Sequence, residues 1–248
     1  MIEQLSQSWL IARREAHSFL VSPFSYAIAG LFLLVNGIFF FLFVNELRGD
    51  FDEVVALFFS FWNFWLLALF IPPLLTMRLV ADEFRLGTIE MLMSAPASDA
   101  AVITGKYLAS MFFTALLWAP TLLFFAIANL FGASFDWGIV LSGYLGAMLV
   151  YGLFNAIGVM VSALAVEPAM SAFSAIVIEL ILFFFMLLPY WVQTDWVKSV
   201  SNRYSIYQIM SEWLLKGVVD SAHLLFLASS IWILLFLATR SLELRRWR

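Results

Sequence analysis

Six long apolar runs dominate this sequence and most constrain how the chain can fold. They cover approximately 24–44, 54–77, 100–131, 137–166, 169–189 and 223–239. A helix needs about 20 mostly apolar residues to cross the hydrocarbon core of a bilayer. The chain is 64% hydrophobic and 12% charged, whereas about 25% of the residues in a soluble domain are charged. The runs therefore predict an all-α, polytopic membrane protein with six spans in one transmembrane domain, residues 1–248.

Three segments outside the predicted spans carry most of the remaining polar residues. Residues 1–22 have apolar side chains at helical spacing and basic residues near their end, which predicts an interfacial helix before the first span. Residues 78–99 form a charged loop between spans two and three. Residues 190–222 place aromatic side chains at helical spacing, including Tyr207 and Trp213, which predicts a short outer interfacial helix before span six.

The distribution of basic residues predicts the orientation of the chain. Nine of the 13 Lys and Arg residues fall in the 1–22 segment, in the loop between spans two and three with the start of span three, or after span six. Four fall on the other side. Because basic residues gather on the cytoplasmic side, both termini and the 78–99 loop are predicted to be cytoplasmic. We expect span two to bend near its inner end, at Pro72-Pro73.

The stretch 77–106, MRLVADEFRLGTIEMLMSAPASDAAVITGK, holds the densest internal cluster of charges. Residues 83–95 divide into two helical faces, the pattern of an amphipathic helix on a surface or in a groove. Gly87 weakens its first turn enough that the helix can break there, Pro96 ends it, and Asp99 is predicted to cap the next helix. Lys106 is expected to project into water. A solvated connector with an interfacial helix is the alternative.

This stretch resembles the signature loop of permease subunits from the second exporter class of ABC transporters. The matching elements are Thr76-Met77-Arg78, Asp82-Glu83, Arg85, Gly87-Thr88, Glu90, Leu92, Ser94-Ala95-Pro96 and Gly105-Lys106. The family usually has two glutamates where this chain has Asp82-Glu83. The resemblance implies a coupling helix that docks into a groove on a cytoplasmic ATPase. The implied coupling residues are Arg78, Glu83, Phe84, Arg85, Gly87, Thr88, Glu90, Met91, Leu92 and Pro96.

Other segments extend the resemblance over nearly the whole chain. Ser22-Pro23-Phe24 and Asn36-Gly37-Ile38 are similar to the opening of the gliding-motility branch of these permeases. Glu167-Pro168 departs from the Asn-Gln expected there. The family implies a multi-pass protein of the bacterial inner membrane, paired with itself or a similar permease and with ABC ATPase subunits that bind ATP and Mg²⁺. In the gliding-motility branch it also implies an auxiliary membrane protein with a large periplasmic domain.

Several functions are disfavoured by the composition and motifs. Gly105-Lys106 is followed by Tyr107, and Ala100 stands where a Walker A motif has its first glycine. ATP hydrolysis is therefore expected on a separate subunit, and we expect no catalytic site, metal or cofactor in this chain. A net charge of −4 argues against nucleic acid as a partner, and the absence of cysteine excludes disulfides and thiol chemistry.

Glu179 lies in the middle of predicted span five. An ionisable residue at that depth is a functional candidate, although a structural glutamate inside the bundle is the alternative. Its expected partners are Asn36, Asn63, Asn155 or its own symmetry mate.

Two other functions stay open beside that of a permease driven by ATP. A proton-coupled secondary carrier would use Glu179. A non-transporting, ATP-driven mechanical complex would act on periplasmic partners.

Overall fold

The computed structural model describes residues 2–47, 50–88, 98–192, 194 and 205–246, and these are helical with no β-strand among them. Six helical stretches are long and apolar enough to cross a membrane, which confirms the predicted class and number of spans. The main helices are α1 (Ile2–Val21), α2 (Pro23–Leu47), α3 (Phe51–Ser60), α4 (Trp62–Thr76), α5 (Ala81–Arg85), α7 (Asp99–Trp118), α8 (Leu122–Leu130), α9 (Trp137–Leu164), α10 (Pro168–Trp191) and α13 (Ser221–Arg246).

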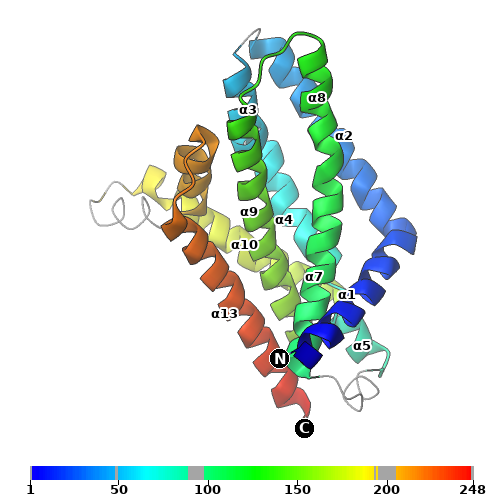
Figure 1. The fold of residues 1–248 in the computed structure, drawn as a ribbon. Helices are drawn as coiled ribbons and strands as arrows, with labels where there is room; N and C mark the ends of the chain where they lie inside the picture. The colour runs from blue at the N-terminus through cyan, green and yellow to red at the C-terminus, as the bar shows by residue number, and fades with distance from the viewer. Residues whose placement is uncertain (1, 48–49, 89–97, 193, 195–204, 247–248) are drawn as a thin grey trace.

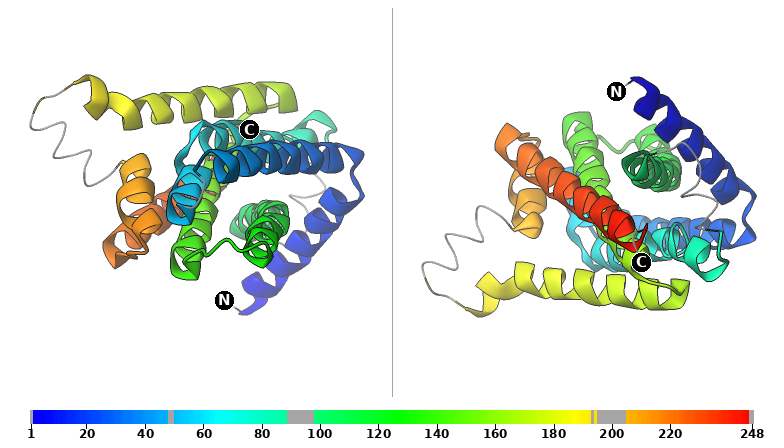
Figure 2. Two further views of the ribbon diagram at one scale, coloured as in Figure 1. Left: turned by 90° about the horizontal axis from the view of Figure 1, so that it is seen from above. Right: turned by 90° about the horizontal axis from the view of Figure 1, so that it is seen from below.

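Helix α9 is the centre of the bundle. Within its most apolar window 78% of the residues are buried, whereas the value is 22% for α10 and for α13. Helices α4, α7, α10 and α13 all pack against α9, and seen from above and below α10 and α1 lie on opposite sides of it (Figure 2). Helix α1 begins and α13 ends at the same end of the bundle, where α5 also lies (Figure 1).

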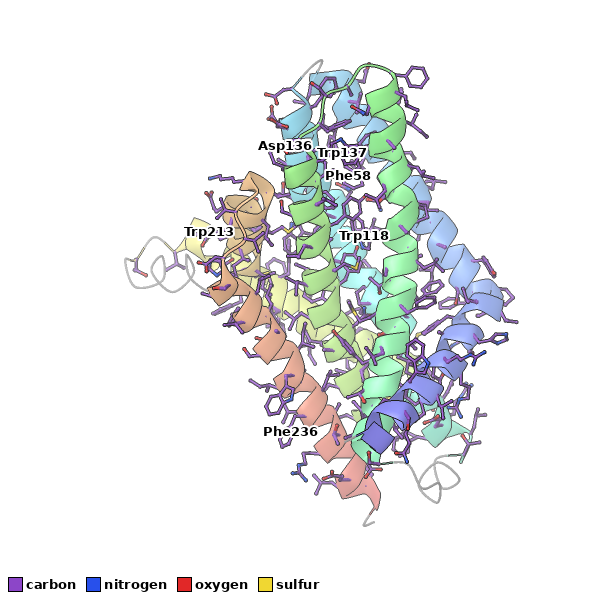
Figure 3. The ribbon with its side chains drawn as sticks, viewed as in Figure 1. Phe58, Trp118, Asp136, Trp137, Trp213 and Phe236 are labelled. Carbon is purple, nitrogen blue, oxygen red and sulfur yellow. The ribbon has the colours of Figure 1, made fainter. Side chains whose placement is uncertain are left out.

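An aromatic cluster fills the interior towards the other end. Trp118, at the end of α7, is 1% exposed, and its ring centre lies 5.1 Å from that of Phe32 and 5.5 Å from that of Tyr151. Both Trp118 and Phe58 point into the space between the helices (Figure 3). Edge-to-face aromatic pairs of this kind stabilise a core beyond their buried area.

Small residues allow close contacts between α9 and its neighbours. A Cβ atom added at Gly158 would lie 2.0 Å from Thr76 Oγ1, and one at Gly146 would lie 2.5 Å from Met210 Sδ. The same geometry joins α1 to α7, because a Cβ at Gly105 would lie 2.7 Å from the Ser8 carbonyl oxygen. These glycines bring helices of one chain together, as expected for small-residue faces in membrane bundles.

Span two is built from two helices. Regular helical geometry is interrupted at Phe61, whose backbone is extended (ψ 172°), whereas α4 continues through Pro72-Pro73. The interruption therefore falls in the half of the span that is farther from α5, and the bend expected at the prolines stays a prediction. In span three, α7 and α8 are joined by a 3-10 turn over Ala119–Thr121.

The described part of the 190–222 segment forms the predicted short helix. It runs from α12 (Ile206–Gln208) through a π-helical turn, η2 (Ile209–Trp213), to a 3-10 turn, η3 (Leu214–Lys216). Gly217 ends it with φ 72°, a conformation that glycine adopts at little cost. The segment is tied to α9, since the Ser142 hydroxyl donates to the Leu214 carbonyl over 2.6 Å.

Candidate functional site

Lys106 is the centre of a buried charge cluster at the end of the bundle that holds α5. Its side chain is 1% exposed, so the expectation that it projects into water is wrong. Its ammonium lies 2.9 Å from Glu83 Oε1 and 3.2 Å from Glu15 Oε1, and it also donates to the carbonyl of Leu79. The reason is local packing: Gly105 brings α1 so close to α7 that Glu15 covers the lysine. We call Lys106, Glu15, Glu83 and Arg14 the lysine cluster.

The lysine cluster joins three segments that are far apart in the sequence. Glu15 belongs to α1, Glu83 to α5 and Lys106 to α7. Arg14 adds a second cation, 2.7 Å from Glu15 and 3.7 Å from Glu83. Buried ions are tolerated when they are paired and hydrogen-bonded, so the cluster fixes the position of α5 against α1 and α7.

The electrostatics of Glu15 follow from this arrangement. Burial alone would raise the pKa of the carboxyl group, but attraction to Lys106 and a hydrogen bond and charge from Arg14 outweigh it. The pKa of Glu15 therefore lies below its ordinary value of 4.5. The charged form is the one that the cluster stabilises.

A second contact fixes the beginning of α5. The Ser162 hydroxyl of α9 accepts hydrogen bonds from the backbone N–H groups of Val80 and Ala81, both over 3.1 Å. It donates to the carbonyl of Met77 over 3.2 Å. The first N–H groups of a helix have no partner within the helix, and here α9 supplies one in place of a side chain from the loop itself.

The far side of α5 rests on α13. The Arg245 guanidinium lies over the Phe84 ring, 4.5 Å from its centre, and donates to the carbonyls of Leu164 and Ala165 at the end of α9. A cation at a helix C-terminus interacts favourably with the free carbonyl groups there. Phe84, a predicted anchor for an ATPase groove, is thus half-buried against its own chain.

The remaining predicted coupling residues in the described structure lie at the surface. Arg78 is exposed and lies over the Phe24 ring at 5.1 Å, and Arg85 pairs with Asp82 over 3.2 Å. Gly87 and Thr88 are exposed. A cleft beside them is lined by Met77, Arg78, Asp82, Arg85, Glu167, Pro168 and Ala169. Glu90, Met91, Leu92 and Pro96 lie outside the described residues.

The helix predicted over 83–95 differs from the one observed. Helix α5 starts at Ala81 and ends at Arg85, and Gly87 follows with φ 69°. The break expected at Gly87 is therefore present, because its left-handed backbone cannot continue a right-handed helix. The cap of α7 is Ser98, whose hydroxyl accepts from the Ala101 N–H over 3.2 Å, and Asp99 is the first helical residue.

None of the asparagines predicted as partners of Glu179 forms a hydrogen bond with it in the described structure. Asn36 donates to the Phe32 carbonyl over 2.9 Å, and Asn155 donates to Thr114 Oγ1 over 3.0 Å. Asn63 is buried with no hydrogen bond to its amide group from the described residues. Glu179 is 0% exposed, and neither of its carboxyl oxygens accepts a hydrogen bond within this part of the chain.

The fold and the site define a multi-pass, all-helical membrane protein whose loop between spans two and three contacts four neighbouring helices, α1, α7, α9 and α13. Comparison with protein families supplies the rest. A family model described as an ABC-2 family transporter protein matches residues 64–241, so the chain belongs to that family. Members of the family are membrane permease subunits, and membership implies partnership with ABC ATPase subunits. No curated protein matches the chain.

Sequence reasoning missed the residues that hold the site together. Lys106 was placed in the Gly105-Lys106 motif and expected in water, and Ser162 was not singled out as a site residue. Glu15 and Arg245 stood in segments interpreted as interfacial or terminal. One signal was present: Gly105 directly precedes the only lysine of span three, and a glycine beside a charge in a span indicates close packing around that charge.

Proposed function

We propose that this chain is the permease subunit of an ATP-driven transporter, in which the 78–99 loop contacts a separate ATPase subunit at the cytoplasmic face. The proposal is supported by membership of the ABC-2 family and by the common position of α5 and the two terminal helices. The biased distribution of Lys and Arg supports a cytoplasmic position for that end of the bundle.

The observation that carries the proposal is the lysine cluster. A loop that only connects two spans needs no buried lysine at its base. Here Lys106 and Ser162 attach α5 to α1, α7 and α9, so a displacement of the loop by a partner would reach three helices of the bundle at once. ATP binding and hydrolysis on the partner would in this way change the packing of the spans.

Docking itself is assigned to the apolar residues beyond Gly87, with Met91 and Leu92 as anchors. Fully burying one such side chain is worth roughly 1.5–3 kcal/mol, so the loss of both weakens binding by about two orders of magnitude or more. We expect Met91→Ala with Leu92→Ala to leave the permease inserted in the membrane but to reduce co-purification of its ATPase.

The matched control is Val218→Ala with Val219→Ala, because both valines are exposed apolar residues in the segment that precedes α13, away from α5. Recovery of the ATPase with this control should equal that of the wild type. If the ATPase is recovered equally with the Met91/Leu92 variant, the loop does not dock the ATPase and only connects the two spans.

A further inference from the structure

Glu179 of α10 is the one buried acidic side chain in the described spans that lies beyond the lysine cluster. It is 0% exposed, and neither carboxyl oxygen accepts a hydrogen bond within the described residues. A carboxylate buried without a cation or donors is unfavourable, because the apolar surroundings do not replace its hydration. Burial of this side chain is therefore favourable only if the carboxyl group carries a proton or acquires a partner.

The helices that pack against α10 place no charged residue at the level of Glu179. Helix α10 packs against α4, α5, α9 and α12. Helix α4 has no charged residue, α9 contributes Tyr144 and Tyr151, and α12 contributes Tyr207. The charged residues of α5 are Asp82, Glu83 and Arg85, which lie at the far end of α10, near Pro168.

Two contacts fix which part of α4 faces Glu179. The Phe183 ring lies 5.7 Å from that of Trp65, and the start of α10 at Pro168 lines a cleft with Met77 just after α4. The two helices are therefore antiparallel. Glu179 precedes Phe183 by four residues, about 6 Å along the helix axis, and this places it level with Ala68 and Leu69.

At that level of α4, two backbone carbonyl oxygens lack their usual hydrogen-bond donors. Pro72 and Pro73 carry no N–H group, so the carbonyls of Ala68 and Leu69 lose their i+4 donors. Ala68 and Pro72 are buried. Tyr151 of α9 is also buried, with a hydroxyl that has no hydrogen bond to the described residues. The two helices that pack most extensively against α10 therefore each carry buried oxygen atoms that can accept a hydrogen bond.

We propose that Glu179 is a proton-binding site that holds α10 against α4 and α9. The protonated carboxyl supplies one O–H donor to the oxygen acceptors at this level. Loss of the proton leaves a charge that needs water, and α10 then separates from α4. A metal cation fits less well, since a single carboxyl group cannot replace the six or more oxygen ligands that such ions take. The proposal does not depend on ATPase docking.

Infrared spectroscopy of the purified protein in lipid vesicles tests whether Glu179 carries a proton. At neutral pH the wild type should show the carbonyl stretching band of a protonated carboxyl group, shifted in heavy water. Glu179→Gln should abolish that band, whereas Glu212→Gln, at an exposed carboxylate paired with Lys216, should retain it. Identical spectra for the wild type and Glu179→Gln in this region would overturn the proposal. If Glu179→Gln does not fold, Glu179→Met is the second neutral variant.

Thiol accessibility tests whether loss of the proton separates α10 from α4. The absence of native cysteine makes the readout specific. Ala175→Cys places a probe one turn before Glu179, at a residue that is 1% exposed. Its labelling rate is measured against pH with Glu179 intact and with Glu179→Gln, so that the titration of the thiol cancels in the ratio. The ratio should rise with pH, by at most about tenfold per pH unit for one proton. A ratio independent of pH would show that the proton does not control the packing of α10.

Discussion

At the scale of single residues, the site depends on side chains whose partners come from other segments. Glu83 was predicted from the loop pattern, but its counter-ion Lys106 was expected in water. A sequence pattern gives the spacing of residues along one helix, and it contains no information about which distant helix covers a given side chain. Ser162 shows the same limit, because nothing in α9 indicates that its hydroxyl caps α5.

Lys106→Met should destabilise the protein strongly, since it leaves Glu15 and Glu83, whose side chains are only 16% and 17% exposed, with the exposed Arg14 as their one remaining cation in the cluster. Breaking a buried ion pair by removing one partner costs about 3–5 kcal/mol. Lys216→Met is the matched control, because Lys216 pairs with Glu212 over 2.6 Å on an exposed surface, where such pairs contribute about 0.3–0.5 kcal/mol. Thermal unfolding in detergent would measure both. Similar losses in the two variants would contradict the buried role of Lys106.

The acid sensitivity of the cluster follows from the lowered pKa of Glu15. A carboxyl group whose folded-state pKa is depressed stabilises the fold above its ordinary value, here 4.5, and this stabilisation is lost as the pH falls through the lower folded-state pKa. Glu15→Gln should therefore be less stable than the wild type at neutral pH, and the difference should shrink as the pH falls below 4.5. The measurement is the unfolding temperature of both proteins against pH. A difference that does not change with pH would show that the charge of Glu15 is not what stabilises the cluster.

At the scale of helices, hydrophobic runs were sufficient to place the spans. Each predicted run is covered by one of the six membrane-length helical stretches, because about 20 apolar residues have no other stable conformation in a bilayer. The ends agree less well where charged residues continue a helix, as in α13, which extends from the predicted 223–239 to Arg246. The internal breaks were not predictable in the same way. Phe61 interrupts span two although it carries no proline or glycine signal, whereas the break at Gly87 was expected from the low helix propensity of glycine.

Gly158→Ala tests how closely α9 must approach α4. The added Cβ would lie 2.0 Å from Thr76 Oγ1 and 3.0 Å from Thr76 Cβ, so the helices must separate at a cost of about 1–3 kcal/mol. Gly30→Ala is the control, since no atom lies within 4 Å of its added Cβ. Thr76→Ala combined with Gly158→Ala should recover part of the loss in thermal stability. No loss in Gly158→Ala alone would show that this contact tolerates expansion.

At the scale of the whole molecule, the beginning of α1, the end of α13 and α5 lie at the same end of the bundle, and the helical turns over 206–216 lie away from it (Figure 1). The lysine cluster and the cleft beside Arg78 both include residues of α5. A displacement of α5 by a partner would therefore reach α1, α7, α9 and α13, which contact it directly, before Glu179 at mid-span. The family match covers 64–241, which leaves α1 outside it, so Glu15 of the lysine cluster lies beyond the matched region.

The orientation of the molecule in the membrane is the last prediction. Nine of 13 basic residues lie on the side of α5, which assigns that end to the cytoplasm. Because the chain has no cysteine, single cysteines report their side without background. With an impermeant thiol reagent on intact cells, Asp50→Cys and Ser221→Cys should be labelled, whereas Thr88→Cys and Leu244→Cys should react only after the membrane is opened. All four residues are exposed, so burial does not confuse the result. Labelling of Thr88→Cys from outside would invert the molecule and place the 78–99 loop where no cytoplasmic ATPase can reach it.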